Sequence, residues 1–279
     1  MKYKIIKGSF HVKGYSPDGD SIRFQANESV HWDYFTWKNA NKKKSEKKQL
    51  RFEAIDALET HYEESHQPRS FGVAALEILL EMIGIKDVIY NIAVTKIVSA
   101  SDGSSGFIAA SSIDMYERPI SLVFPADVDL VDGRELDAGD LPLDDSINMK
   151  LLELGLVYPT FYGTMQDELL TAFTSATEKA REKRVGIWAL DKTPEFMLWN
   201  KDTIQDDVII FPKLFRRLTA FFEGRSSYDE LNEYLKKQKD KLLIRSTGEK
   251  KMMHEIMEID GRHIKFLMNP ENLIFEPKG

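Results

Sequence analysis

The chain has 279 residues, of which 42% are apolar, so it can bury a core large enough for one large domain and a smaller one. It has no cysteine, which excludes disulfides, cysteine nucleophiles and thiolate metal sites. No apolar run reaches the ~18 residues that cross a bilayer, and the N-terminal stretch turns polar too soon for a signal peptide. We therefore expect no membrane partner and a cytoplasmic protein.

The net charge of −7 comes from one segment. Residues 127–145, DVDLVDGRELDAGDLPLDD, hold eight acidic residues and one basic residue, Arg134, so the rest of the chain is neutral overall. Net charge therefore neither selects nor excludes a nucleic-acid partner. We expect this segment to be a solvated insertion.

Short strands are predicted through the first half of the chain. Residues 2–13 and 21–26 alternate between apolar and polar and flank the turn signal Asp18-Gly19. Residues 27–49 contain four aromatics and the run NKKKSEKKQ, which predicts an extended hairpin or inserted loop. The lysines of that run either form a solvated loop or follow a nucleic-acid backbone.

Helices and further strands follow. Helical spacing predicts a helix over 71–83 with Ser70 as its N-cap, and a short helix capped by Ser146 that ends at Gly155. Strands are expected at 88–99, 107–114 and 120–124, and further helices at 166–184, 211–222 and 228–239, with a hairpin at 254–268. These elements predict an α+β fold, a small closed barrel with packed helices over residues 1–190 and a second small domain over 191–279.

The most informative segment is residues 50–60, LRFEAIDALET. It is predicted to be a strand, Leu50 to Ile55, that ends in an acidic turn. Arg51, Asp56 and Glu59 on this segment are residue types that phosphodiester chemistry uses together. Since site loops usually lie at strand ends, we expect these three side chains to share a site.

These motifs resemble the staphylococcal nuclease (thermonuclease) family. DGDS at 18–21, LRFEAIDALET at 50–60 and DMYERPISLVF at 114–124 are similar to its strand motifs, and the resemblance runs in the same order over about residues 1–190. Three helical segments agree with it: FGVAALEILLEMI, INMKLLELGLVY and TSATEKAREKRVGIW. The resemblance implies a five-stranded OB-fold-like β-barrel and calcium-dependent hydrolysis of DNA and RNA.

The resemblance also implies roles for single residues. Asp20, Asp56 and the backbone carbonyl of Ala57 would hold Ca²⁺, a cation that prefers oxygen ligands. The other implied residues are the catalytic set, Glu59 as general base with Arg51 and Arg118 on the phosphate, and the substrate-binding tyrosines Tyr116, Tyr158 and Tyr162.

The chain departs from the family pattern near the site. Ala57-Leu58 replaces a Thr-Pro pair, Met115 replaces a lysine, Glu117 replaces a glycine and Phe161 replaces a tyrosine. The alternative to a nuclease is therefore a catalytically weak or inactive module that binds nucleic acid or protein. The survival of Arg51, Glu59 and Arg118 favours the nuclease.

The segment 191–279 shows no catalytic constellation. Its residues Lys213, Arg216 and Arg217 alternate with apolar residues at helical spacing, which is ordinary amphipathic patterning. Extension of a substrate groove, self-association and docking of a partner all remain open for this segment.

Overall fold

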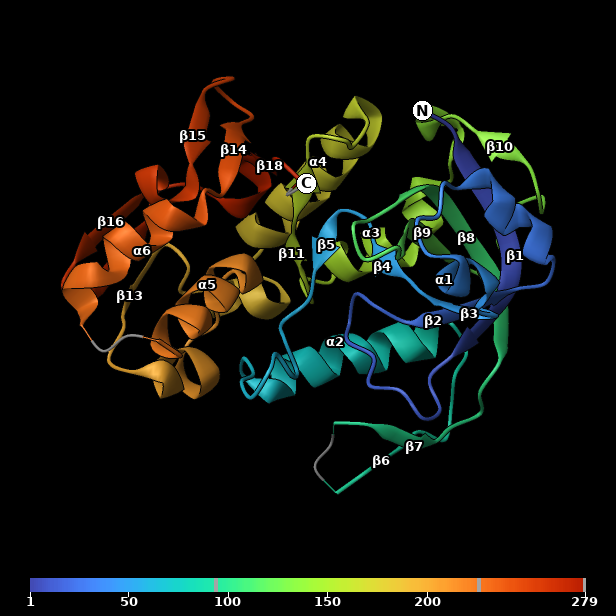
Figure 1. Cartoon of the computed structure of the whole chain (residues 1–279), viewed down its shortest axis with the longest axis horizontal. Coiled ribbons are helices and arrows are strands. Elements are labelled where there is room, and N and C mark those ends of the chain that lie inside the picture. The colour runs from blue at the N-terminus through green and yellow to red at the C-terminus, as the bar shows by residue number, and fades with distance from the viewer. Residues whose placement is uncertain (93–94, 225–226, 278–279) are drawn as a thin grey trace.

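The computed structural model describes residues 1–92, 95–224 and 227–277. Within these residues the buried apolar side chains form two clusters, one beneath a curled sheet in the N-terminal part and one centred on the C-terminal segment. Figure 1 shows the two parts side by side, with helices α4 (Asp167–Glu182) and α5 (Pro212–Phe222) near their junction.

The N-terminal sheet has seven strands among the described residues. They are β1 (Tyr3–His11), β2 (Arg23–Ala26), β3 (Lys47–Gln49), β4 (Arg51–Phe52), β8 (Ser104–Ile113), β9 (Pro119–Pro125) and β10 (Glu135–Leu136). Their order is β3-β2-β1-β8-β9-β4, with β10 paired to β1. The outermost strands β3 and β4 are successive pieces of one segment, so the sheet curls back towards itself.

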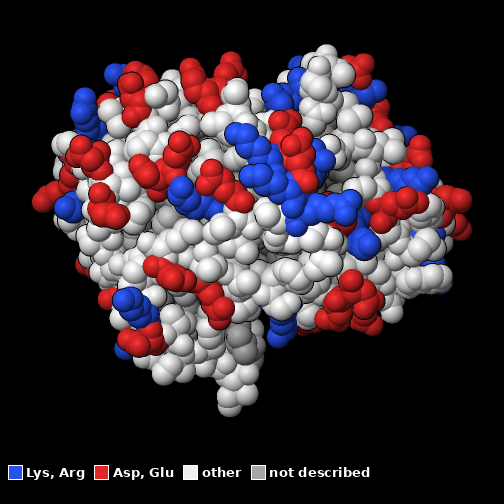
Figure 2. Space-filling view, turned by 180° about the vertical axis from the view of Figure 1, so that it is seen from behind, with Lys and Arg blue, Asp and Glu red and all other residues white. Residues whose placement is uncertain are grey.

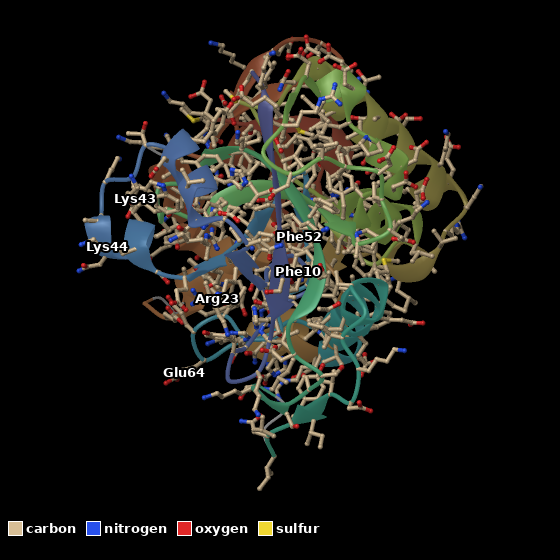
Figure 3. The ribbon with its side chains drawn as sticks, turned by 90° about the vertical axis from the view of Figure 1, so that its right-hand side faces the viewer. Phe10, Arg23, Lys43, Lys44, Phe52 and Glu64 are labelled. Carbon is tan, nitrogen blue, oxygen red and sulfur yellow. The ribbon has the colours of Figure 1, made fainter. Side chains whose placement is uncertain are left out.

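Alternation along the strands fills the inside of this curl with large side chains. Phe10, Phe24 and Phe52 are at most 1% exposed. In Figure 3, Phe10 and Phe52 lie in the interior, whereas Lys43 and Lys44 project outward from the short helix α1 (Ala40–Lys44). The inward apolar face therefore fixes the register of the sheet.

The strand predicted at 50–55 is divided in two. Ala54 has a φ of 71°, the left-handed conformation that non-glycine residues seldom adopt, and it separates β4 from β5 (Ile55–Asp56). β4 pairs in parallel with β9, whereas β5 pairs with β11 (Tyr158–Pro159) outside the main sheet. The turn thus directs Asp56 towards the C-terminal part.

Two helices of the N-terminal part test the predicted caps. α2 (Arg69–Met82) begins earlier than predicted, with Pro68 rather than Ser70 at its N-cap, so the Ser70 prediction was wrong. α3 (Ile147–Glu153) is capped as predicted, because the Ser146 hydroxyl accepts a hydrogen bond from the Met149 amide. It ends before Gly155, whose φ is 63°.

The C-terminal segment is tied to the N-terminal part by pairing and by a shared core. Its elements are α5, α6 (Leu231–Gln238), β13 (Glu195–Met197), β14 (Lys241–Ile244), β15 (Lys250–Met252), β16 (Met257–Asp260), β17 (His263–Phe266) and β18 (Leu273–Phe275). β18 pairs in parallel with β12 (Phe161–Tyr162), and Leu58 and Tyr158 lie in the C-terminal core. The second of the two clusters therefore contains side chains from both parts of the chain.

The mixed α+β class is confirmed, but the sheet differs in detail from a five-stranded barrel. Residues 27–49 form a 3-10 helix (Ser29–Tyr34), α1 and β3, so they are an insertion between the antiparallel strands β2 and β3. The strand predicted at 88–99 is a small pair, β6 (Ile89–Tyr90) and β7 (Ile97–Ser99), and positions 93–94 lie outside the described residues. No helix in the part of the chain that the structure describes has the length and apolar character needed to cross a membrane.

Candidate functional site

Two arginines meet at one aspartate at an end of the curled sheet. Arg118 donates from Nε and Nη2 to Asp114 Oδ2 at 2.8 and 2.7 Å, and Arg51 Nη1 lies 3.9 Å from the same oxygen. The Asp114 side chain is 5% exposed, whereas those of Arg51 and Arg118 are 31% and 32% exposed. We call Arg51 and Arg118, joined by Asp114, the arginine pair.

The turn that carries Arg118 is held by local hydrogen bonds. Asp114 Oδ1 accepts from the amides of Tyr116 and Arg118, both at 2.9 Å. Glu117 has a φ of 60°, which explains why a glycine suits this position. Its carboxylate accepts from the amides of Lys38 and Asn39, and these bonds offset the cost of that backbone conformation.

Three acids lie close to Asp20, namely Asp18, Asp56 and Glu59. We call Asp20, Asp56 and Glu59 the carboxylate cluster. Arg216 of α5 reaches it from the C-terminal part: Nη1 is 3.1 Å from Asp56 Oδ1 and 2.5 Å from Glu59 Oε1, and Nη2 is 2.6 Å from Asp56 Oδ2. Both oxygens of Asp56 and one oxygen of Glu59 therefore already bind a cation, the guanidinium of this chain.

Close packing brings the segments of this cluster together. A Cβ at Gly19 would lie 2.8 Å from the Cβ of Ala75, so only glycine lets the turn beside Asp20 approach α2 this closely. The fully buried Gln67 accepts from the Glu59 amide at 3.3 Å and donates to the carbonyl of Ile210 at 2.7 Å. One side chain thus links the Glu59 loop to the segment that precedes α5.

Burial dominates the electrostatics of the cluster. It raises the pKa of Asp20 well above its usual range, and the neighbouring Asp56 raises it further. Burial also raises the pKa of Glu59 to about 7, although Arg216 opposes the shift. Pairing with Asp56 and Glu59 outweighs the effect of burial on Arg216 and raises its pKa, so Arg216 stays charged.

The predicted calcium site does not fit this arrangement. Calcium takes six to eight oxygen ligands at ~2.3–2.6 Å, and it would need the carboxylate oxygens that Arg216 holds. Among the residues that the structure describes, no three acidic or histidine side chains are arranged to hold a metal ion. The acids are therefore close together, but an arginine already binds both oxygens of Asp56 and one oxygen of Glu59.

A cavity of about 400 Å³ opens beside the arginine pair, between the two parts of the chain. Arg51, Tyr116, Tyr162 and Lys213 are among the residues that line it. The Arg51 guanidinium lies 4.7 Å and the Lys213 ammonium 5.7 Å from the centre of the Tyr162 ring. Burial opposes the change, but Lys213 and Arg51 lower the pKa of Tyr162. This wall of the cavity is cationic.

A second cavity of about 240 Å³ lies next to the first, and Tyr116 lines both. Its other lining residues are mostly basic: Arg23, Lys42, Lys47, Lys48 and Arg118, with Ser45, Gln49 and Glu117. Figure 3 shows Arg23 on the same side of the molecule as α1. By contrast, the face in Figure 2 has an oblique band of Lys and Arg between clusters of Asp and Glu, so its charge is mixed.

The structure separates the predicted tyrosines. Tyr116 is 60% exposed and Tyr162 lines the larger cavity. Tyr158 is fully buried, donates to Asp191 at 2.6 Å and packs on Trp188, so its ring is not available to a ligand and the substrate-binding prediction for it was wrong. Ala57 is buried directly after Asp56.

The sequence did not indicate that Lys213 and Arg216 are site residues. Both project from α5 towards the N-terminal part, one helical turn apart. The adjacent Arg217 instead pairs with Asp240 at 2.5 and 2.7 Å. No local signal distinguishes these three basic residues, because the partners of Arg216 lie about 160 positions earlier in the chain.

Comparison with known proteins identifies the family of the chain. The family model described as staphylococcal nuclease homologue matches residues 49–190, about half of the chain, including the arginine pair, Asp56 and Glu59. No curated protein matches the chain. Such a domain indicates a nuclease-related, nucleic-acid-interacting module. The chain belongs to the staphylococcal nuclease homologue family.

Proposed function

We propose that this protein binds single-stranded nucleic acid in the two adjoining cavities, without requiring a metal. The observation that carries the proposal is Tyr116, an exposed ring that lines both cavities, with Arg51 and Lys213 in one and Arg118, Lys42 and Lys47 in the other. Single-strand binders combine a cationic groove for phosphates with aromatic rings on which unpaired bases stack.

The arginine pair has charge to spare for a phosphate. Asp114 neutralises one of its two guanidinium groups, and both side chains remain about one third exposed. A guanidinium binds phosphate oxygens in a bidentate manner, and so this pair is the expected anchor for the backbone. Tyr162 and Lys213 extend the same anchor into the larger cavity.

The test is fluorescence anisotropy of a labelled single-stranded oligonucleotide in EDTA. Tyr116→Ala is expected to weaken binding at least fivefold, since a stacked base contributes ~1–3 kcal/mol. Trp199→Ala is the matched control, because Trp199 is a similarly exposed aromatic, at 56%, that lines neither cavity. Equal losses in the two variants would contradict the proposed stacking role.

Calcium-dependent hydrolysis is the second candidate function. It is favoured by Glu59, whose raised pKa of about 7 suits a general base near neutral pH. Asp20 and Asp56 lie close to it, but Asp56 and Glu59 are paired with Arg216. Hydrolysis by this set therefore requires Arg216 to leave. Cleavage of the oligonucleotide in calcium, compared with EDTA and with Glu59→Gln, tests this candidate.

A further inference from the structure

We infer that Arg216 is the resident cation of the carboxylate cluster, and that Arg216 and a divalent metal ion exclude each other there. The inference does not depend on nucleic-acid binding. It begins with the three hydrogen bonds of 2.5–3.1 Å that join one guanidinium to Asp56 and Glu59. Such charge-assisted, forked contacts are among the strongest hydrogen bonds in proteins.

The position of Arg216 is fixed by the helix that carries it. Leu214, Phe215 and Leu218 on α5 are fully buried in the C-terminal core. That core includes Leu58, which lies between Asp56 and Glu59 in the sequence. Packing therefore places the arginine and the acids against each other, and the contact is part of the fold.

Charge explains why the acids need a cation. The side chains of Asp56 and Glu59 are only 9% and 16% exposed. Two carboxylates so close together and so poorly hydrated repel each other unless a positive charge lies between them. Arg216 supplies that charge from within the chain, with its own side chain 23% exposed.

Geometry excludes a second cation. A metal ion on Asp56 would lie beside the guanidinium nitrogens, which already contact both oxygens of that side chain. Two like charges at that distance in a poorly hydrated site repel strongly. Metal binding would therefore require the Arg216 guanidinium to withdraw from Asp56 and Glu59.

Arg217 provides a matched control on the same helix. It also makes a forked contact with a buried acid, Asp240, and its side chain is 19% exposed. Its partner lies within the C-terminal segment. Removing Arg217 therefore breaks an ion pair of similar type without freeing the carboxylate cluster.

The experiment compares the wild-type protein, Arg216→Gln and Arg217→Gln by thermal unfolding with and without calcium, and by calorimetric titration with calcium chloride. The wild type is expected to show no calcium-dependent shift in melting temperature and no heat of binding. Arg216→Gln is expected to lose stability and to regain part of it in calcium. Arg217→Gln is expected to lose stability without a calcium response.

Two results would overturn the inference. One is calcium binding by the wild type that Asp56→Asn removes, a comparison that does not depend on whether Arg216→Gln folds. The other is an Arg216→Gln protein that gains nothing from calcium, whether it is folded or unfolded. Refolding of an unfolded Arg216→Gln chain on addition of calcium would support the inference.

Discussion

The arginine pair and the carboxylate cluster both contain residues of the segment 51–59, yet their charges are balanced in opposite ways. In the pair, one buried aspartate serves two partly exposed arginines, which leaves positive charge open to a ligand. In the cluster, one arginine from the C-terminal part serves two poorly exposed acids, so the carboxylate oxygens are already bound. Site residues can therefore survive in the sequence while only one half of the site is open to a partner.

The largest expected effect comes from removing the internal cation. Arg216→Met leaves Asp56 and Glu59 buried without a partner and should lower the free energy of unfolding by about 3–5 kcal/mol, measured by urea denaturation. Arg118→Met leaves Asp114 with Arg51 and two backbone amides as partners and should change the free energy of unfolding by no more than about 1 kcal/mol. Equal losses would remove the distinction between cluster and pair.

Glu53 is also a buried acid, but its hydrogen-bond partner is a phenol and not a guanidinium. Tyr3 donates to its carboxylate at 3.0 Å, and burial raises the pKa of Glu53 from 4.5 to about 7. Between these two values the folded state holds a proton that the unfolded state releases, so stability falls as pH rises from about 4.5 to 7. The total cost above pH 7 is up to about 3 kcal/mol.

Glu53→Gln should remove this loss. Its advantage in unfolding free energy over the wild type should therefore grow between pH 5 and 7, as followed by urea denaturation across that range. Glu276→Gln is the control, because Glu53 and Glu276 both line the larger cavity and the Glu276 side chain is about half exposed. An advantage that does not change with pH would show that Glu53 has an ordinary pKa in the folded protein.

The smallest expected effect concerns the open side of the site. Arg51→Gln and Arg118→Gln should each weaken binding of a single-stranded oligonucleotide about tenfold and reduce the salt dependence of the affinity by about one phosphate contact. Lys44→Gln is the control, because Lys44 is exposed on α1 and lines neither cavity. A loss for Lys44→Gln as large as for either arginine would point to general charge attraction.

Features that short segments encode could be predicted from the sequence alone. The periodicity of α2, α3 and α4 follows from patterns within short segments, whereas the common site of Arg51 and Arg118 was implied by the family resemblance. Two features could not be anticipated. Ala54 adopts a left-handed backbone that its side chain does not favour, and this turn directs Asp56 towards α5. Arg216 looks the same as Arg217 in an amphipathic pattern, and only the packed helix shows which of the two faces the acids.

The most direct test of this account measures binding and cleavage of a single-stranded oligonucleotide by the wild-type protein, side by side in calcium and in EDTA. The account predicts equal affinity in both and an intact oligonucleotide throughout, because the arginine pair needs no metal and Arg216 holds the carboxylates. Cleavage in calcium that EDTA abolishes, or affinity that depends on calcium, would contradict it.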